Sequence, residues 1–145
     1  MIPMRSNFFT ACVLTAFVVL AGCGSNPAAP TSSAPFSQSD IRVGTGAEAT
    51  NGKRLSVAYT LWLYDASQPD GKGRQMQSNV GQTPFTFTLG AGFVIDGWDR
   101  GCVGMREGGI RRLIIPPDLA YGSSGQGDIP GNATLVFDIE LLNVQ

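Results

Sequence analysis

The sequence predicts an α+β domain that combines an antiparallel sheet of five or six strands with one short helix. Three observations predict this fold class. Several short segments alternate between apolar and polar residues, which is the period of half-buried strands. The 19 glycines and the 14% of charged residues are typical of a compact domain with many turns rather than of a helical bundle. Only residues 95–102 are suited to a short helix, and the repeated strand–helix alternation of a parallel sheet is absent.

The strands are placed by this alternation and are ended by turn residues. Residues 53–65 alternate most clearly, and one face of the segment is apolar, with Leu55, Val57, Tyr59, Leu61 and Leu63. Residues 67–73, SQPDGKG, are expected to form a turn or loop. Residues 84–89 alternate again, and residues 109–117 form a strand that two prolines stop. The last strand, in residues 133–142, turns inward Leu135, Phe137, Ile139 and Leu141.

The N-terminus is expected to be a targeting segment. Arg5 precedes a 15-residue apolar run, residues 8–22, which is shorter than the roughly 20 residues needed to span a bilayer. The run ends in LAGC, residues 20–23, which resembles a bacterial lipobox. This resemblance implies that residues 1–22 are a lipoprotein signal peptide and that Cys23 carries a diacylglyceryl group. The alternative is an ordinary signal peptide with an incidental cysteine.

Residues 23–39 are rich in Ser, Ala and Pro and carry no charge, so we expect a flexible tether from the lipidated cysteine to a domain over residues 40–145. The alternative is an added edge strand. The expected location is the cell envelope, with the protein anchored by its lipid. Gly24, rather than Asp, follows the cysteine, so in a Gram-negative host the resemblance to sorted lipoproteins favours the periplasmic face of the outer membrane.

Several classes of function are excluded by composition. The chain has no histidine, which rules out a histidine-based triad, a histidine general base and a histidine metal ligand, and no cofactor or metal is expected. The net charge of −1 does not favour nucleic acid. The two Gly-x-Gly stretches lack the spacing of a dinucleotide site. With Cys12 in the signal peptide and Cys23 lipidated, Cys102 is left alone and is expected to be a structural thiol.

Aromatic residues are the main candidates for a site. They lie on predicted inward faces or beside the helix, and core packing is the simplest role for any one of them: Tyr59, Phe85, Trp98, Tyr121 and Phe137. Three details favour a pocket. Tyr59 is the only polar-tipped residue on an aliphatic face, Trp98 opens the helix between glycines, and Tyr121 lies in a Gly-rich loop suited to cover a cavity.

Three stretches resemble the FKBP-type peptidyl-prolyl cis–trans isomerases in order and spacing: VGTGAEATNGKRLSVAYTLWLYD, TPFTFTLGAGFVIDGWDRGCVGMREGGIRRLIIPPDLAYGSSG and IPGNATLVFDIELL. The resemblance covers residues 41–144 and implies a sheet curled around the helix. It places Trp98 at the floor of an active pocket, with walls from Tyr59, Phe85, Val94, Ile95, Tyr121, Ile129 and Phe137. It also implies that the Ile95 N–H and the Tyr121 hydroxyl bind ligand carbonyls, and that the partners are proline-containing polypeptides and macrolide inhibitors.

The chain departs from the family pattern at three positions. Met76 and Gln77 align with a usual Phe and Asp of the pocket, although an ungapped alignment would place Gln75 and Met76 there instead. Leu61 replaces a usual Gly. Met is apolar and adaptable, but Gln cannot carry the negative charge that a carboxylate would bring beside Tyr59. The departures therefore imply lower activity and weaker macrolide binding than in typical members.

The expected function is peptidyl-prolyl isomerisation of extracytoplasmic proteins by a monomer that binds the twisted amide in an apolar aromatic pocket. The alternatives are a lipid-anchored proline-peptide binding or chaperone module with little or no catalysis, and a purely structural lipoprotein. Gly97 is expected to free space beside Trp98 so that the indole forms an open floor. Trp98→Ala is then expected to cost less stability than the ~3–5 kcal/mol typical of a fully buried Trp.

Overall fold

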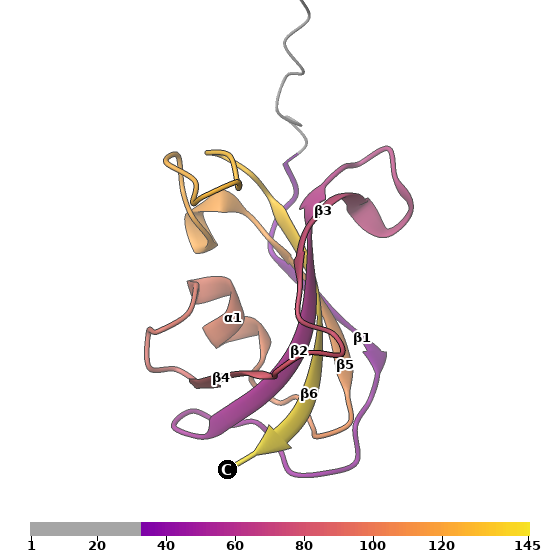
Figure 1. Ribbon diagram of the computed structural model, residues 1–145, viewed down its shortest axis with the longest axis vertical. Coiled ribbons are helices and arrows are strands. Elements are labelled where there is room, and N and C mark those ends of the chain that lie inside the picture. Colours follow the sequence, from indigo (N-terminus) through magenta and orange to yellow (C-terminus); the bar gives the residue numbers. More distant parts are fainter. Residues whose placement is uncertain (1–32) are drawn as a thin grey trace, which may run out of the picture.

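The computed structural model describes residues 33–145 (Figure 1). Six strands form one antiparallel sheet in the order β1-β5-β6-β2-β3, with β4 also paired to β2. The strands are β1 (Ser37–Arg42), β2 (Arg54–Tyr64), β3 (Lys72–Ser78), β4 (Phe85–Thr88), β5 (Ile110–Ile115) and β6 (Leu135–Val144). The helices are α1 (Asp96–Gly101) and the 3₁₀ turns η1 (Pro69–Gly71) and η2 (Pro117–Leu119). The predicted fold class is confirmed.

The expected signal peptide, the expected lipidation site Cys23 and the first part of the expected tether lie outside the described residues. Within residues 33–145, no helix has the length and apolar character needed to cross a membrane. The edge strand β1 begins at Ser37, so the last three residues of the stretch expected as tether, 37–39, pair with β5. The edge-strand alternative therefore describes these residues, and the tether interpretation stays a prediction for the residues before them.

The concave face of the sheet forms the core. Figure 1 shows the sheet strongly curved, with α1 and the segment after β5 on the same side of it. The inward residues predicted on β2 and β6 are buried on this face, apart from the half-buried Tyr59: Leu55, Val57, Leu61, Leu63, Leu135, Phe137, Ile139 and Leu141. Burial of this apolar surface is the main driving force for the curved arrangement.

Two glycines let α1 lie directly on β5. A Cβ at Gly97 would collide with the side chain of Ile115, and a Cβ at Gly101 would lie 2.5 Å from Leu113 Cδ2. The two glycines are four residues apart, so they share one face of the helix. The expectation that Gly97 frees space beside Trp98 is wrong, because this glycine faces β5 and brings the helix against the sheet.

Asn79 replaces a strand partner opposite Tyr59 on β2. On this edge β3 pairs with residues 60–64 of β2 and β4 pairs with residues 54–57, which leaves a gap between them. The Asn79 side chain accepts a hydrogen bond from the Tyr59 N–H at 2.7 Å and donates to the Val57 carbonyl at 3.3 Å. The Asn79 side chain thus satisfies backbone groups of β2 that no strand pairs with here. These hydrogen bonds also fix the position of Tyr59, which lines the cavity described below.

Three partly buried ion pairs join strands of the sheet, two of them at its edges. Arg111 is 7% exposed and joins Asp40 of β1, at 2.6 Å, to the Gly101 carbonyl at the end of α1. On the other face Asp138 accepts from Arg112 at 2.7 Å and from Lys72 of β3 at 2.5 Å. Burial raises the pKa of the Asp138 carboxyl, but the Arg112 and Lys72 cations together lower it more, so this pKa lies below its ordinary value.

We expect Asp138→Asn to lower the free energy of unfolding at pH 7 by about 1.5–3 kcal/mol, the range for hydrogen bonds to charged groups. Because the folded pKa is lowered, the stabilisation is complete above the unfolded pKa of about 3.9 and is lost as the pH falls through the folded value. Urea unfolding of both proteins at pH 7 and at acidic pH measures this effect. The control is Glu140→Gln, which breaks the exposed pair with Arg42 and should cost under about 1 kcal/mol. If the two variants lose the same free energy of unfolding, the Asp138 ion pairs are no more stabilising than the exposed pair of Glu140.

Candidate active site

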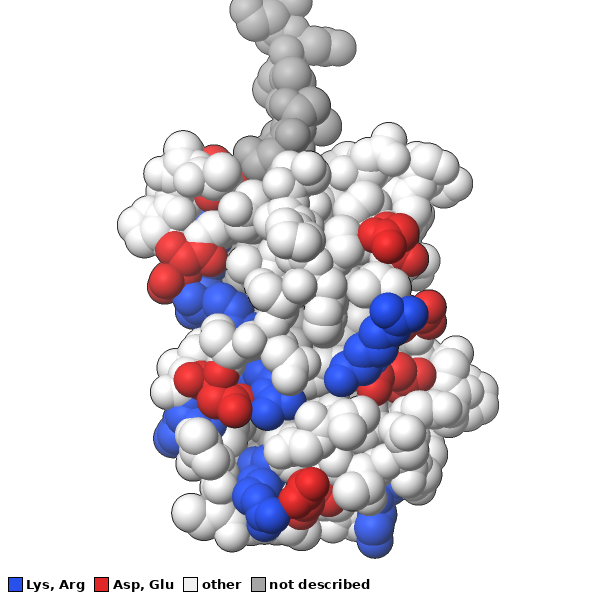
Figure 2. Space-filling view, turned by 180° about the vertical axis from the view of Figure 1, so that it is seen from behind, with Lys and Arg blue, Asp and Glu red and all other residues white. Residues whose placement is uncertain are grey.

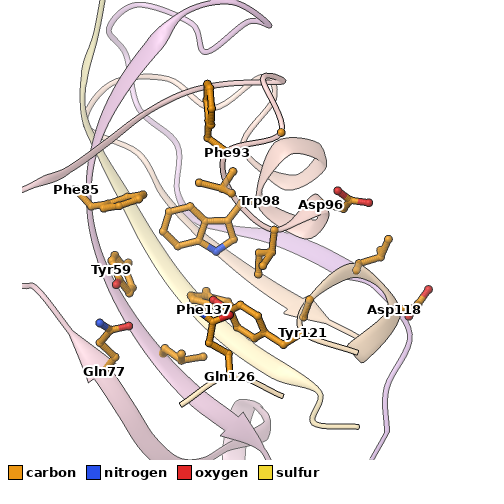
Figure 3. A pocket seen from close by; sticks show the side chains of 16 residues that line it. Tyr59, Gln77, Phe85, Phe93, Asp96, Trp98, Asp118, Tyr121, Gln126 and Phe137 are labelled. Atoms are coloured by element: carbon orange, nitrogen blue, oxygen red, sulfur yellow. The ribbon is translucent and has the colours of Figure 1, made fainter. Parts of the chain in front are cut away.

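A cavity of about 540 Å³ opens between α1, the segment after β5 and the concave face of the sheet (Figure 3). Its lining residues come from four strands, α1, η2 and the loops beside them. These segments are far apart in the sequence, so the cavity depends on the curved shape of the sheet. Sixteen residues line it: Tyr59, Leu61, Gln77, Phe85, Gly92, Phe93, Val94, Ile95, Asp96, Trp98, Asp118, Leu119, Ala120, Tyr121, Gln126 and Phe137.

Trp98 is the centre of an aromatic cluster in this cavity. The rings of Tyr59, Phe85 and Phe137 stand nearly perpendicular to the indole, with centroid distances of 5.1, 5.9 and 5.3 Å. Such edge-to-face contacts are the preferred aromatic geometry and fix the position of the indole. Trp98 is only 4% exposed, so it is a core residue as well as a lining residue. The expectation of a small stability cost for removing it is therefore wrong.

The indole nitrogen of Trp98 has no hydrogen-bond partner among the described residues, although it is buried. Figure 3 shows this nitrogen on the edge of the indole that faces Phe137 and Tyr121, inside the cavity. A buried donor without an acceptor is costly, and native proteins leave few of them. The indole nitrogen is thus a buried donor without an acceptor, and almost none of it is exposed to the cavity.

The structure brings together all the sequence-predicted site residues except two. Met76 and Ile129 pack against the core but are not among the lining residues. Gln77 lines the cavity together with Tyr59, whereas Gln75 does not line it. This geometry agrees with the alignment that matches Gln77, not Met76, to the usual carboxylate. Leu61, the replacement for a usual Gly, also lines the cavity.

Asp99 of α1 holds the loop that precedes the helix. Its two carboxylate oxygens accept hydrogen bonds from the Gly90 and Gly92 N–H groups at 2.8 and 3.0 Å, and both glycines have positive φ. The clamped loop leads into Ile95, which has an extended backbone at the N-cap of α1. The Ile95 N–H donates to no backbone carbonyl among residues 33–145, so it is free to bind a ligand carbonyl.

A loop closed on itself holds Tyr121 at the cavity. The Gly125 N–H donates to the Tyr121 carbonyl at 3.1 Å, and the Asn132 N–H donates to the Gly122 carbonyl at 2.8 Å. Gly131 packs against the Ser123 backbone so closely that no Cβ would fit. These contacts join backbone atoms on opposite sides of the loop. The loop is therefore compact even though it has little secondary structure.

Both cavity tyrosines keep their protons through the neutral range. Burial raises the pKa of Tyr121, and burial together with the neighbouring Tyr121 raises the pKa of Tyr59. Their hydroxyls are therefore donors at neutral pH. By contrast, Cys102 lies outside the cavity and is completely buried, and desolvation raises the pKa of its thiol to about 12. It is a structural thiol, not a nucleophile.

Several lining residues were not predicted from the sequence. They lie in loops, in the 3₁₀ turn η2 and at the first residue of α1: Gly92, Phe93, Asp96, Asp118, Leu119, Ala120 and Gln126. No strand or helix period marks these positions in the sequence. Contacts with residues far away in the sequence place these segments at the cavity. Phe93 is the one residue of this group that the sequence could have marked as a lining residue, because a large apolar side chain in a Gly-rich turn is seldom part of the core. In the structure it is 83% exposed.

Comparison with known proteins identifies a family for the part of the chain that forms this cavity. A family model for FKBP-type peptidyl-prolyl cis-trans isomerases matches residues 46–142. The FK506-binding protein of Neisseria meningitidis serogroup B is 46% identical over 106 residues, which cover 72% of this chain and 92% of that protein. FK506-binding protein 4 of Rhizopus delemar is 47% identical over 107 residues, which cover 73% of this chain and 26% of that protein.

Two solved structures are similar in fold. FkpA from Escherichia coli gives a TM-score of 0.63 at 36% identity, and the match covers 76% of this chain and 48% of FkpA. This chain therefore spans about half of FkpA. AtFKBP13 also gives a TM-score of 0.63 at 36% identity, with 76% of this chain and 93% of that protein covered.

Proposed function

The chain belongs to the family of FKBP-type peptidyl-prolyl cis-trans isomerases, and from this premise we propose that it isomerises X-Pro bonds of extracytoplasmic proteins in the aromatic cavity. The observation that carries this proposal is the indole of Trp98 at the base of the cavity, enclosed by the perpendicular rings of Tyr59, Phe85 and Phe137. Such a cavity can accept a proline ring against its aromatic floor and walls.

The chemistry requires only selective binding. Resonance makes the C–N bond of an X-Pro amide partly double, and its uncatalysed rotation takes tens to hundreds of seconds against a barrier of about 20 kcal/mol. At the twisted transition state this resonance is lost and the carbonyl oxygen carries less negative charge. Water stabilises the planar polar amide better than the twisted one, so an apolar cavity favours the transition state. Each ~1.4 kcal/mol of this preference raises the rate tenfold.

Six of the predicted residues have a role in this mechanism. Trp98 lies under the proline ring, and Tyr59, Phe85 and Phe137 form its walls. The Ile95 N–H and the Tyr121 hydroxyl bind the flanking peptide carbonyls and fix the peptide while the amide turns. No proton is transferred and no covalent bond forms.

We expect kcat/KM on an uncharged tetrapeptide to be constant between about pH 6 and pH 9. The pKa values of Tyr59 and Tyr121 are raised above the usual 10, so both hydroxyls stay protonated in this range and are lost as donors only at higher pH. A protease-coupled or NMR exchange assay across this range measures the profile. A bell-shaped profile centred near neutrality would instead indicate general acid–base catalysis and would contradict this mechanism.

The activity is lower than in typical family members, and macrolide binding is weaker, because Gln77 brings no charge to the amide and Leu61 adds a side chain to the cavity. A second candidate function, proline-peptide binding with little catalysis, is favoured by the same two residues. Measurement of kcat/KM on an X-Pro tetrapeptide with residues 23–145 carrying Cys23→Ser separates the two. Acceleration over buffer supports the enzyme, whereas saturable binding without acceleration supports the binding module.

The protein is a monomer held in the cell envelope by lipid at Cys23, after removal of residues 1–22. The support is the lipobox at residues 20–23 and the uncharged Ser, Ala and Pro segment up to β1. At ~3.1 Å per residue this segment reaches roughly 40 Å when extended, which leaves the cavity free to meet other proteins. Fatty-acid labelling tests the anchor: the wild type should incorporate labelled palmitate and Cys23→Ser should not, and equal labelling of the two would refute it.

A further inference from the structure

The segment before β1 carries three X-Pro bonds of its own. They are Asn26–Pro27, Ala29–Pro30 and Ala34–Pro35, and the first two lie before the described residues. Residues 26–30, NPAAP, have no charge and only small side chains. Such bonds are what the proposed isomerase binds, so the distance between this segment and the cavity decides whether the chain can bind itself.

β1 starts at the end of the sheet where the cavity lies. Ser37, its first residue, pairs with Ile114 of β5 in an antiparallel register. The chain before Ser37 therefore leaves the sheet beside the residues that follow Ile114, which lead through Pro116 into η2. Asp118 and Leu119 of η2 line the cavity. Figure 1 shows the start of β1 and the segment after β5 at the same end of the sheet.

Phe36 fixes the point from which the segment leaves the domain. Its side chain is half-buried and packs against the core, whereas Pro35 is exposed and does not line the cavity. The Ala34–Pro35 bond is thus held outside the site, and the two earlier bonds are the candidates to enter it. The mouth of the cavity is open to them, because the lining residues Phe85 and Phe93 are 42% and 83% exposed.

The length of the segment matches the span to the cavity. In the order β1-β5-β6-β2, β1 lies three strands away from β2, which carries Tyr59. This separation is roughly 14 Å at about 4.8 Å per strand. The six residue steps from Ser33 back to Pro27 cover roughly 14 Å as a random coil and roughly 19 Å as polyproline II. An intramolecular ligand has its highest effective concentration, on the order of millimolar, when its length matches the span.

We propose that residues 26–30 enter the cavity of the same chain, where the Asn26–Pro27 and Ala29–Pro30 bonds are isomerised in competition with other peptides. The inference rests on the proposed isomerase function and adds the chain's own tether to its substrates. At a millimolar effective concentration, a segment whose dissociation constant is near millimolar occupies the cavity about half of the time. A client polypeptide must displace it, so the KM for an added peptide is raised while kcat is unchanged.

Exchange NMR tests the intramolecular reaction on residues 23–145 carrying Cys23→Ser and isotope-labelled proline. Uncatalysed exchange between the cis and trans forms takes tens to hundreds of seconds, and a synthetic peptide of residues 23–36 with the same substitution gives this reference rate. We expect Pro27 and Pro30 to exchange at least about tenfold faster in the protein than in the peptide. The rate should be independent of protein concentration, and an excess of an X-Pro tetrapeptide should slow it.

Matched variants assign the competition to the two prolines. In Pro27→Ala/Pro30→Ala, the KM for the tetrapeptide should fall about two- to fivefold with kcat unchanged, because no tether bond then competes for the cavity. The control Pro35→Ala removes a proline of the same segment that lies outside the cavity lining, and it should leave KM at the wild-type value.

The results for the tether and for the free peptide are distinguishable. If Pro27 and Pro30 exchange at the rate of the synthetic peptide while the tetrapeptide is catalysed, the tether is not a substrate and the inference is overturned. An exchange rate that rises in proportion to protein concentration would assign the reaction to a neighbouring chain and would also overturn it, as would an unchanged KM in the double variant. If the tetrapeptide itself is not accelerated over buffer, the proposed isomerase function fails instead.

Discussion

Trp98→Ala is expected to reduce kcat/KM to the uncatalysed rate and to lower the free energy of unfolding by about 3–5 kcal/mol. The loss of activity follows because the indole is the surface on which the proline ring lies in the proposed mechanism. The loss of stability follows because the same indole is 4% exposed and touches the rings of Tyr59, Phe85 and Phe137. One side chain thus serves the core and the site together.

A control must separate these two effects. Leu141 is fully buried but does not line the cavity, so Leu141→Ala should cost about 2–5 kcal/mol of stability without removing a wall of the site. The chain has two tryptophans, so Trp62 remains as a fluorescent probe of folding in Trp98→Ala. Both variants are assayed under conditions where Trp62 fluorescence and circular dichroism report a folded protein. If folded Trp98→Ala keeps a rate within a few-fold of the wild type, the indole is not the catalytic floor.

The parts of the fold that could be predicted are those with a buried face. β2 and β6 alternate cleanly because one side of each strand lies in the core, and α1 is the only segment with room for a helix. The edge strands β1 and β3 have no such pattern. All six residues of β1 are exposed, and no residue of β3 is fully buried. Their attachment depends on the Asp40–Arg111 and Lys72–Asp138 pairs, which join residues far apart in the sequence.

The site shows the same division. Tyr59 and Phe137 lie on β2 and β6, whose sequences alternate between apolar and polar residues. Their inward direction could therefore be predicted from the strand period. Asp96 and Asp118 reach the rim through α1 and η2, whose positions depend on packing that has no local signature in the sequence. Gly97 was misread for a related reason. A glycine permits close approach, but the sequence does not say which neighbour approaches, and here it is Ile115 of β5.

Gln77 is the position where a single substitution is expected to raise the activity. Gln77 and Tyr59 both line the cavity, and the raised pKa of Tyr59 keeps its hydroxyl a donor. A carboxylate there would accept a hydrogen bond from Tyr59, and charge-assisted bonds are roughly twice as strong as neutral ones. Its negative charge would also favour the twisted amide, whose carbonyl carbon is more electron-poor than in the planar form. We expect Gln77→Asp to raise kcat/KM about three- to tenfold, which corresponds to roughly 0.7–1.4 kcal/mol.

Two matched variants show whether charge and position both matter. Gln77→Asn has the length of aspartate without its charge and should give no gain. Gln75→Asp places the same charge two residues earlier on β3, outside the cavity lining, and should also give none. The gain in Gln77→Asp should disappear at acidic pH, because protonation removes the charge as the pH falls through the carboxyl pKa, ordinarily about 3.9. If Gln77→Asp is no faster than Gln77→Asn, the missing charge does not limit this enzyme. If Gln75→Asp gives the same gain, a negative charge on β3 matters but its place at position 77 does not.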